Sequence, residues 1–156
     1  MEFKQNYIPL AYDKIHETAS SLKNEGARYV QILAVNYDNE IDLVYSYMTK
    51  DGELKDFNVD GLPKESHVAS ISDVFFEAFV CENEIHDLFG ITFDNLKLDF
   101  AGNFYSLSQE KPMTVISPEE LARREKEAKI AAAKAKAAKK KAEQKNNEPK
   151  EKTEEQ

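Results

Sequence analysis

The feature that most restricts the fold of this chain is the segment from Glu82 to Phe93, which carries four ionisable side chains and then a glycine. Gly90 follows directly after Phe89. A glycine just past the last helical turn adopts a positive φ at little cost, so it commonly ends a helix. From Ile91 onward, apolar and polar residues alternate as they do in a strand. The segment therefore predicts a helix that ends at Gly90, buries one face on a core and leads directly into a strand.

Acidic residues are concentrated in the first three quarters of the chain. Of the 156 residues, 1–118 hold 9 Lys and Arg against 20 Asp and Glu, a net charge of −11, whereas 119–156 carry +3. We therefore expect one domain, residues 1–117, followed by a charged Ala/Lys/Glu-rich tail, residues 118–156, that is helical or disordered. The acidic domain disfavours free nucleic acid as its main partner, because it would repel phosphates.

Changes in the hydrophobic period outline the first elements of the domain. Apolar spacings of three and four predict a helix over residues 11–25 with Gly26 as its stop. Period-two patterns predict strands over 28–35, 41–47 and 53–59. The first of these strands is apolar on both faces, which favours an interior position in the sheet.

The second half of the domain begins after a turn at Gly61–Lys64, which is expected to end the third strand. Ser70 and Asp73 match a capping box, so a helix is predicted to start at Ser70. Its apolar residues form two groups on nearly opposite faces. The helix is therefore either kinked or covered from two sides, and a partner subunit is one source of the second surface. Residues 96–107 are expected to form a C-terminal hairpin.

Together these elements predict an α+β fold of two layers, in which a mixed or antiparallel sheet carries two helices on one face. The predicted helices are the ones at residues 11–25 and 70–89. No apolar run approaches the roughly 20 residues that span a bilayer, and the first residues lack the pattern of a signal peptide. We therefore expect any membrane association to depend on other subunits.

The ionisable residues of the segment are the first candidates for chemistry, but their spacing argues against catalysis. Glu82 and His86 stand four residues apart and can pair on one helical face, yet a metal ion would need a further ligand from elsewhere. Cys81, the only cysteine, cannot hold an iron–sulfur cluster alone and points away from His86 on a helix. A phosphate-binding glycine pattern is missing from the sequence. We expect no catalytic, cofactor-binding or metal-binding residue in this chain.

Surface recognition is the function that the segment favours instead. The candidate interface residues are Glu82, Glu84, His86, Asp87, Phe89 and Gly90. Carboxylates at fixed helical positions are suited to directional contacts with Arg or Lys of a partner. For Glu84 and Asp87 the alternative is internal, with the carboxylates holding loops of their own domain. Phe89 and Gly90 are expected to act mainly as determinants of the fold.

The tail is the only basic part of the chain. Lysines such as Lys134 and Lys136 could attract nucleic acid or anionic lipid. The tail has no aromatic residue for base stacking, however, and no apolar face for a membrane interface. We expect a solvated helix or tether, or a contact with an acidic neighbouring subunit.

Residues 82–91 resemble the Glu-x-Glu-x-x-Asp-Φ-Phe-Gly-Ile signature (Φ, apolar) of the 30-kDa subunit family of respiratory complex I. That family includes the equivalent small subunit of energy-converting [NiFe] hydrogenases. The matching residues are Glu82, Glu84, Asp87, Phe89, Gly90 and Ile91. The resemblance extends over residues 10–107. Respiratory members continue with His-Pro-Asp-Leu-Arg-Arg, which residues 94–100 lack, so the chain is most similar to the small, cofactor-free subunit of an Ech-type hydrogenase.

This resemblance implies a cofactor-free subunit in the peripheral arm of a complex at the cytoplasmic face of the cell membrane. The implied partners are the hydrogenase-like large subunit, which carries the [NiFe] centre, and iron–sulfur subunits. Such a complex would couple ferredoxin oxidation and proton reduction to ion translocation. One alternative is the equivalent 30-kDa subunit of a complex I-like NADH/quinone dehydrogenase. Another is a stand-alone adaptor whose basic tail contacts nucleic acid.

Overall fold

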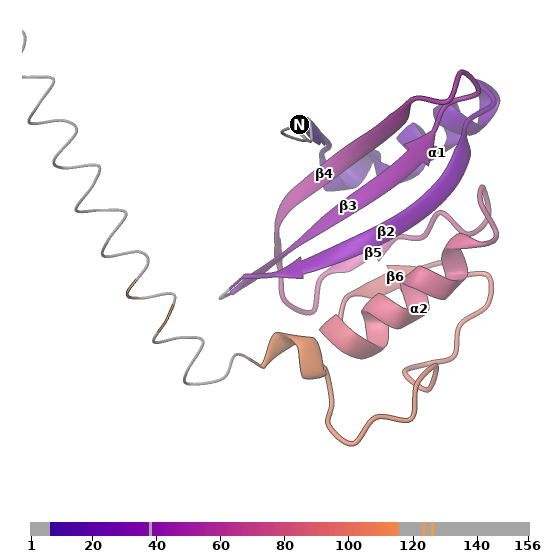
Figure 1. Cartoon of the computed structure of the whole chain (residues 1–156). Coiled ribbons are helices and arrows are strands. Elements are labelled where there is room, and N and C mark those ends of the chain that lie inside the picture. Colours follow the sequence, from indigo (N-terminus) through magenta and orange to yellow (C-terminus); the bar gives the residue numbers. More distant parts are fainter. Residues whose placement is uncertain (1–6, 38, 116–122, 124–125, 127–156) are drawn as a thin grey trace, which may run out of the picture. The chain divides into compact units, whose positions relative to one another are not determined.

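The structure is a computed structural model of the whole chain, and it describes residues 7–37 and 39–115 together with Arg123 and Lys126 (Figure 1). The predicted tail therefore lies outside the described residues, apart from Arg123 and Lys126, which are helical and exposed. None of the helices in the described part is long and apolar enough to cross a membrane.

A four-stranded mixed sheet forms the first layer, in the order β1-β4-β3-β2. The short strand β1 (Tyr7–Pro9) runs parallel to β4 (Leu54–Pro63). The central strand β3 (Glu40–Met48) is antiparallel to β4 and to β2 (Arg28–Asn36). A turn at Asp51–Gly52 connects β3 to β4, as the sequence predicts, and Gly52 has a φ of +85°.

Two helices and a small second sheet complete the fold. A 3₁₀ turn, η1 (Tyr12–Lys14), leads into α1 (Ile15–Asn24), and α2 (Ala78–Phe89) packs along β2 (Figure 1). The second sheet pairs β5 (His67–Ala69) with β6 (Thr92–Asp94) in parallel. A second 3₁₀ turn, η2 (Pro112–Thr114), follows close to the end of the domain.

One apolar core joins the inner face of the sheet to both helices. The core residues of β3 and the helices include Ile41, Leu43, Tyr45 and Tyr47 from β3, Ile15, Ala19 and Leu22 from α1, and Ala78 and Ile85 from α2. The four β3 residues are at most 1% exposed and alternate along the strand, as the period of two predicts. The predicted two-layer α+β fold, with two helices on one face of a mixed sheet, is thus confirmed.

Strand β2 differs from its predicted interior position, because it lies at the edge of the sheet. A register shift between Tyr29 and Gln31 breaks its alternation. Tyr29 and Ile32 are buried, whereas Leu33 is 49% exposed. Apolar residues on both sides of a strand suggest burial on both sides, but here one side stays open to solvent.

Strand β4 also extends beyond its predicted end at Val59. Asp60 and Gly61 are accommodated as a register shift opposite β3, after which the pairing resumes through Leu62 and Pro63. Gly61 has a φ of +68°, and its N–H donates to Oδ1 of Asp42 at 2.8 Å. The glycine therefore makes a bulge rather than a strand end.

The second helix begins at Ala78, eight residues after its predicted start at Ser70. The segment between them forms turns, such as the one closed by Val74 N–H on the Ile71 carbonyl. Asp73 does not complete a capping box, because its carboxylate pairs with His16 at 2.9 Å. The predicted helix start is wrong because the side chains that suggested it have tertiary partners instead.

The predicted C-terminal hairpin over residues 96–107 is likewise wrong. Residues 95–107, here named the C-terminal loop, contain no strand. Asn95, Ala101 and Gly102 all have positive φ values, which do not fit a continuous strand. Backbone groups of the C-terminal loop bond to side chains of α2 instead.

Candidate partner interface on helix α2

Helix α2 buries three polar side chains on the sides that face the sheet and the C-terminal loop. Glu82 and Asn83 are 0% exposed, and Asp87 is 6% exposed. Polar groups so far from water are stable only when they are hydrogen-bonded. The partners of these three residues therefore define what the charged segment does in the fold.

Glu82 joins the middle of α2 to the segment that precedes it. Its Oε1 accepts the Ile71 N–H at 2.8 Å, and its Oε2 accepts the Ser70 hydroxyl at 2.7 Å. Ser70 Oγ also accepts the N–H of Ser72 at 3.0 Å. One carboxylate thus fixes the chain where it leaves β5, in place of the regular capping that the sequence suggested.

The environment of Glu82 favours its protonated form. Burial raises the pKa of Glu82 above its ordinary value, and the hydrogen bonds from Ile71 and Ser70 oppose this effect in part. Burial also raises the pKa of Tyr45 well above its ordinary range, with a further contribution from the Glu82 carboxylate. The Glu82 carboxyl group therefore acts inside the core and not on the molecular surface.

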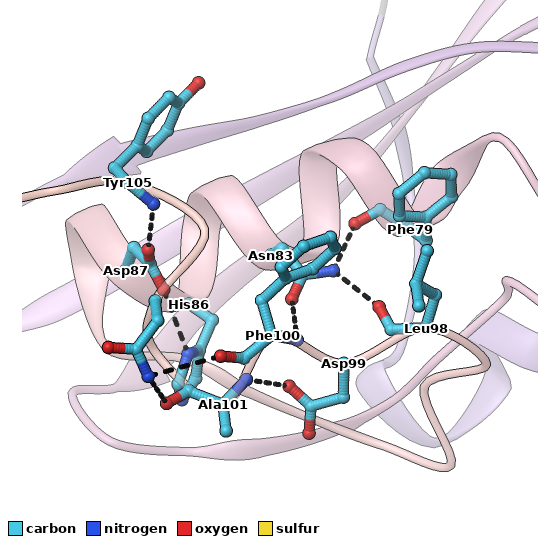
Figure 2. A network of polar contacts seen from close by, with 10 residues as sticks. Phe79, Asn83, His86, Asp87, Leu98, Asp99, Phe100, Ala101 and Tyr105 are labelled. Carbon is cyan, nitrogen blue, oxygen red and sulfur yellow. Dashed lines mark hydrogen bonds and ion pairs between the residues drawn. The ribbon is translucent and has the colours of Figure 1, made fainter.

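Asn83 attaches the C-terminal loop to α2 (Figure 2). Its Nδ2 donates to the carbonyl of Phe79 at 2.7 Å and to that of Leu98 at 2.8 Å. Its Oδ1 accepts the Phe100 N–H at 2.9 Å. Three of the four hydrogen bonds that an amide side chain can make are thus made to the backbone.

Asp87 holds the same loop one helical turn later. Its Oδ2 accepts the N–H of Tyr105 at 2.8 Å, and its Oδ1 lies 3.4 Å from Nδ1 of His86 (Figure 2). Glu84, on the more exposed side, accepts the Tyr105 hydroxyl at 3.2 Å. The internal contacts expected as the alternative for Glu84 and Asp87 are therefore present.

Phe89 and Gly90 have the structural positions that the sequence indicates. Phe89 is half-buried and packs against the core. Gly90 has a φ of +80°, and its N–H donates to the His86 carbonyl at 2.9 Å, which ends the helix. A Cβ at this position would lie 2.6 Å from Cδ of Lys111.

The six predicted interface residues thus lie together on α2 and at its end, but on different sides. Glu82 is fully buried, whereas Glu84 and His86 are half-buried. The suggested Glu82–His86 pair is not formed, because the Glu82 oxygens bond to Ser70 and Ile71. Contact of the six residues with a partner stays a prediction.

Asn83 is the residue that sequence reasoning missed. An asparagine inside a predicted helix could have indicated this role, since asparagine is unfavourable there unless its side chain has a specific partner. Its neighbours Glu82 and Glu84 drew attention instead because they are charged. Among the residues that the structure describes, no group of three or more His, Cys, Asp or Glu side chains is placed to hold a metal ion.

The fold and the site define a small α+β domain whose buried polar residues hold its own loops. The chain belongs to the family described as the respiratory-chain NADH dehydrogenase 30 Kd subunit, whose model matches residues 8–99. The resemblance of residues 82–91 to this family is thereby confirmed.

Solved structures share the fold, among them the following two. One belongs to the membrane-bound sulfane sulfur reductase (MBS), an archaeal respiratory membrane complex, with a TM-score of 0.59, 20% identity, and coverage of 70% of this chain and 69% of that one. The other is the trypsin-resistant fragment (1–134) of Nqo5, with a TM-score of 0.52, 20% identity, and coverage of 59% and 80%. No curated protein sequence matches this chain.

Proposed function

We propose that this chain is a non-catalytic, cofactor-free subunit in the peripheral arm of a membrane-bound energy-converting hydrogenase. In this role it packs against the hydrogenase-like large subunit, which holds the [NiFe] centre, and lies close to iron–sulfur subunits. The complex as a whole oxidises ferredoxin, reduces protons and translocates ions at the cytoplasmic face of the membrane. The chain contributes a rigid surface on which these subunits assemble.

The observation that carries this proposal is the family match over residues 8–99. The match includes the sheet, both helices and the Glu82–Gly90 segment, so it covers the whole folded core and not an isolated motif. A respiratory membrane complex is also the source of one solved structure with this fold.

The choice of a hydrogenase within the family depends on the residues after β6. Respiratory members have His-Pro-Asp-Leu-Arg-Arg here, whereas residues 94–100 read Asp-Asn-Leu-Lys-Leu-Asp-Phe. In this chain the stretch ends β6 and begins the C-terminal loop that Asn83 holds. The two arginines of the respiratory pattern are therefore replaced by residues that cannot supply the same cationic contacts.

Purification of the tagged chain from its native membranes tests the proposal. We expect the chain to be extracted by mild detergent together with a large subunit that contains nickel and with iron–sulfur subunits. Hydrogen evolution from reduced ferredoxin should co-purify, and both metals should stay with the other subunits when the complex is dissociated. A chain that is recovered alone, or that retains the metal itself, contradicts the proposal.

The same preparation separates the alternatives. Oxidation of NADH with reduction of a quinone, without nickel, would indicate the complex I-like dehydrogenase. Nucleic acid that co-purifies with the chain, is released steeply by salt and is lost on truncation at Ser117 would indicate the adaptor.

A further inference from the structure

A contiguous group of apolar side chains lies on the outer surface of the domain, where α2 meets the C-terminal loop. We name it the aromatic patch, and it consists of Phe76, Phe79, Val80, Leu98, Phe100 and Phe104. Phe76 is 57% exposed, and Val80, Leu98 and Phe100 are 40–42% exposed. Single exposed apolar residues are ordinary, but a contiguous patch of this kind typically marks an interaction site.

Ring contacts join neighbouring aromatic residues within each half of the patch. The rings of Phe76 and Phe79 are 5.0 Å apart, and those of Phe100 and Phe104 are 5.2 Å apart. Asn83 connects the two groups, because its Nδ2 bonds to the backbone carbonyls of both Phe79 and Leu98. The helix and the loop therefore present one surface, and it is held in shape by a buried amide.

Three acidic residues adjoin the patch residues in the chain. Glu77, directly before α2, precedes Val80 by three residues, and Glu84 follows Val80 by four, while Asp99 lies between two patch residues of the loop. In the described part of the chain, Lys97 is the cationic residue next to the patch in sequence, and its charge helps to lower the pKa of Asp73. The patch thus has an apolar centre and an acidic rim.

We propose that the aromatic patch is the docking surface for a partner subunit whose complementary surface is apolar at its centre and lined by Lys or Arg. This inference rests on the proposed function and moves the predicted interface from the buried carboxylates of Glu82 and Asp87 to the outer side of α2. Aromatic residues at the centre of an interface and charged residues at its rim are the usual arrangement of binding surfaces.

The acidic rim decides among the possible occupants. An anionic lipid surface would be repelled by the carboxylates. A second copy of the chain would place like charges opposite one another, since residues 1–118 carry a net charge of −11. The chain's own tail is basic, but Leu121 and Ile130 are its only large apolar residues up to Lys145, so it cannot fill an aromatic surface. A basic-rimmed partner polypeptide satisfies both features.

Photo-crosslinking in native cells tests this assignment. The tagged full chain carries p-benzoylphenylalanine in place of Val80 or, as the matched control, in place of Leu33, which is 49% exposed on the sheet. We expect position 80 to crosslink to one co-purifying subunit, at an apolar segment with Lys or Arg close by, at least about tenfold more than position 33. Crosslinks from position 80 to a second copy, to lipid or to the tail would overturn the assignment, as would equal yields from both positions.

A pair of aromatic substitutions provides a second readout. Phe76→Ser should reduce the co-purifying partner at least about tenfold, whereas Tyr37→Ser, at a similarly exposed aromatic residue, should leave it within about twofold. If Phe76→Ser lowers the yield of folded chain, Glu77→Lys replaces it, and its loss of partner should be larger at low salt than at high salt. Unchanged co-purification in the folded variant contradicts the docking surface.

Failure of this inference differs from failure of the proposed function. If the wild-type chain co-purifies with the oxidoreductase subunits, but the substituted chains crosslink to those subunits only from position 33, the aromatic patch alone is overturned. A wild-type chain that co-purifies with no oxidoreductase subunit overturns both.

Discussion

The four-stranded sheet and the C-terminal loop hold their backbones in different ways. In the sheet, β3 pairs along most of its length with β2 on one side and β4 on the other, over an apolar core. The C-terminal loop has no strand partner, and the side chains of Asn83 and Asp87 bond to its backbone at Leu98, Phe100 and Tyr105. One region is held by many equivalent contacts, and the other by a few particular ones.

This difference determines how each region responds to a single change. A net backbone hydrogen bond contributes roughly 1 kcal/mol, so loss of one among many in the sheet is tolerated. The C-terminal loop has fewer contacts, and each has no substitute nearby. We therefore expect substitutions in the core of the sheet to affect the whole domain, and substitutions of the α2 amide and carboxylates to affect the loop first.

The largest effect is expected for Leu43→Ala at the centre of β3. Leu43 is 0% exposed, and its removal leaves a cavity in the core shared by the sheet and both helices. We expect a loss of about 3 kcal/mol, with sheet and loop unfolding in one transition in a denaturant titration. Leu33→Ala, on the exposed side of β2, should cost less than about 1 kcal/mol. Separate transitions for Leu43→Ala would contradict the single core.

Asn83→Ala should destabilise the C-terminal loop while leaving the sheet intact. It removes the partners of the Leu98 carbonyl and the Phe100 N–H together, which should cost about 2–3 kcal/mol. Amide hydrogen exchange should show faster exchange at Phe100, while the amides of β3 keep their protection. Asn58→Ala, at a half-buried asparagine of β4, is the matched control and should leave the loop unchanged. Equal loss of protection in β3 would show that the loop is not a separate unit.

The parts that were predictable from the sequence are those fixed by local chemistry. The alternation of Ile41, Leu43, Tyr45 and Tyr47 indicated their burial correctly, because a strand places alternate residues on one face. Gly26 and Gly90 marked the ends of α1 and α2, and both have positive φ. In each case the residues whose pattern predicts the element are also the residues that form it.

The parts that were not predictable depend on partners far along the chain. Ser70 suggested a helix start, but its hydroxyl bonds to Glu82, twelve residues away. The hairpin predicted for the C-terminal loop ignored the buried Asn83, whose bonds reach residues 15 and 17 positions later. The edge position of β2 follows from the strand order, which hydrophobic period does not contain. Hydrogen bonds from a side chain to backbone groups far along the chain therefore cannot be predicted from local sequence patterns.

The raised pKa of the buried Glu82 carboxyl group can be tested through the pH dependence of stability. Because burial raises its pKa in the folded chain above the ordinary value of 4.5, the folded state binds the proton more tightly than the unfolded state. Its contribution to stability is therefore greatest below pH 4.5 and declines as the pH rises from there through the folded pKa. Glu82→Gln keeps the shape but removes this titration.

Melting temperatures of wild type and Glu82→Gln, measured from pH 4 to pH 8, provide the comparison. We expect the difference in melting temperature to shift in favour of the Gln variant as the pH rises. The effect of Glu82→Gln should stay below that of Asn83→Ala, because an amide can still bond to Ile71 and Ser70. Comparing the two proteins at each pH removes the contribution of groups whose pKa is lowered by other partners, such as Glu65, which pairs with Lys111. A difference that stays constant with pH would contradict a raised pKa at Glu82.

The smallest effect is expected from a pair of glycines that share a backbone conformation but not their surroundings. Gly52, in the turn before β4, has a φ of +85° and open space where a Cβ would lie, whereas Gly90 has a φ of +80° and lies under the Lys111 side chain. Gly52→Ala should therefore cost only the left-handed strain, about 1 kcal/mol. Gly90→Ala should add a further small cost, because the Lys111 side chain and its exposed pair with Glu65 have to move. Because the lysine side chain is flexible, chemical denaturation should give a free energy of unfolding only slightly lower for Gly90→Ala than for Gly52→Ala. In a Lys111→Ala background, the two glycine substitutions should cost the same.

If Gly90→Ala instead lowered stability as much as Leu43→Ala does, the end of α2 would be as rigid as the core of the sheet, and the contrast between the two regions would not hold there.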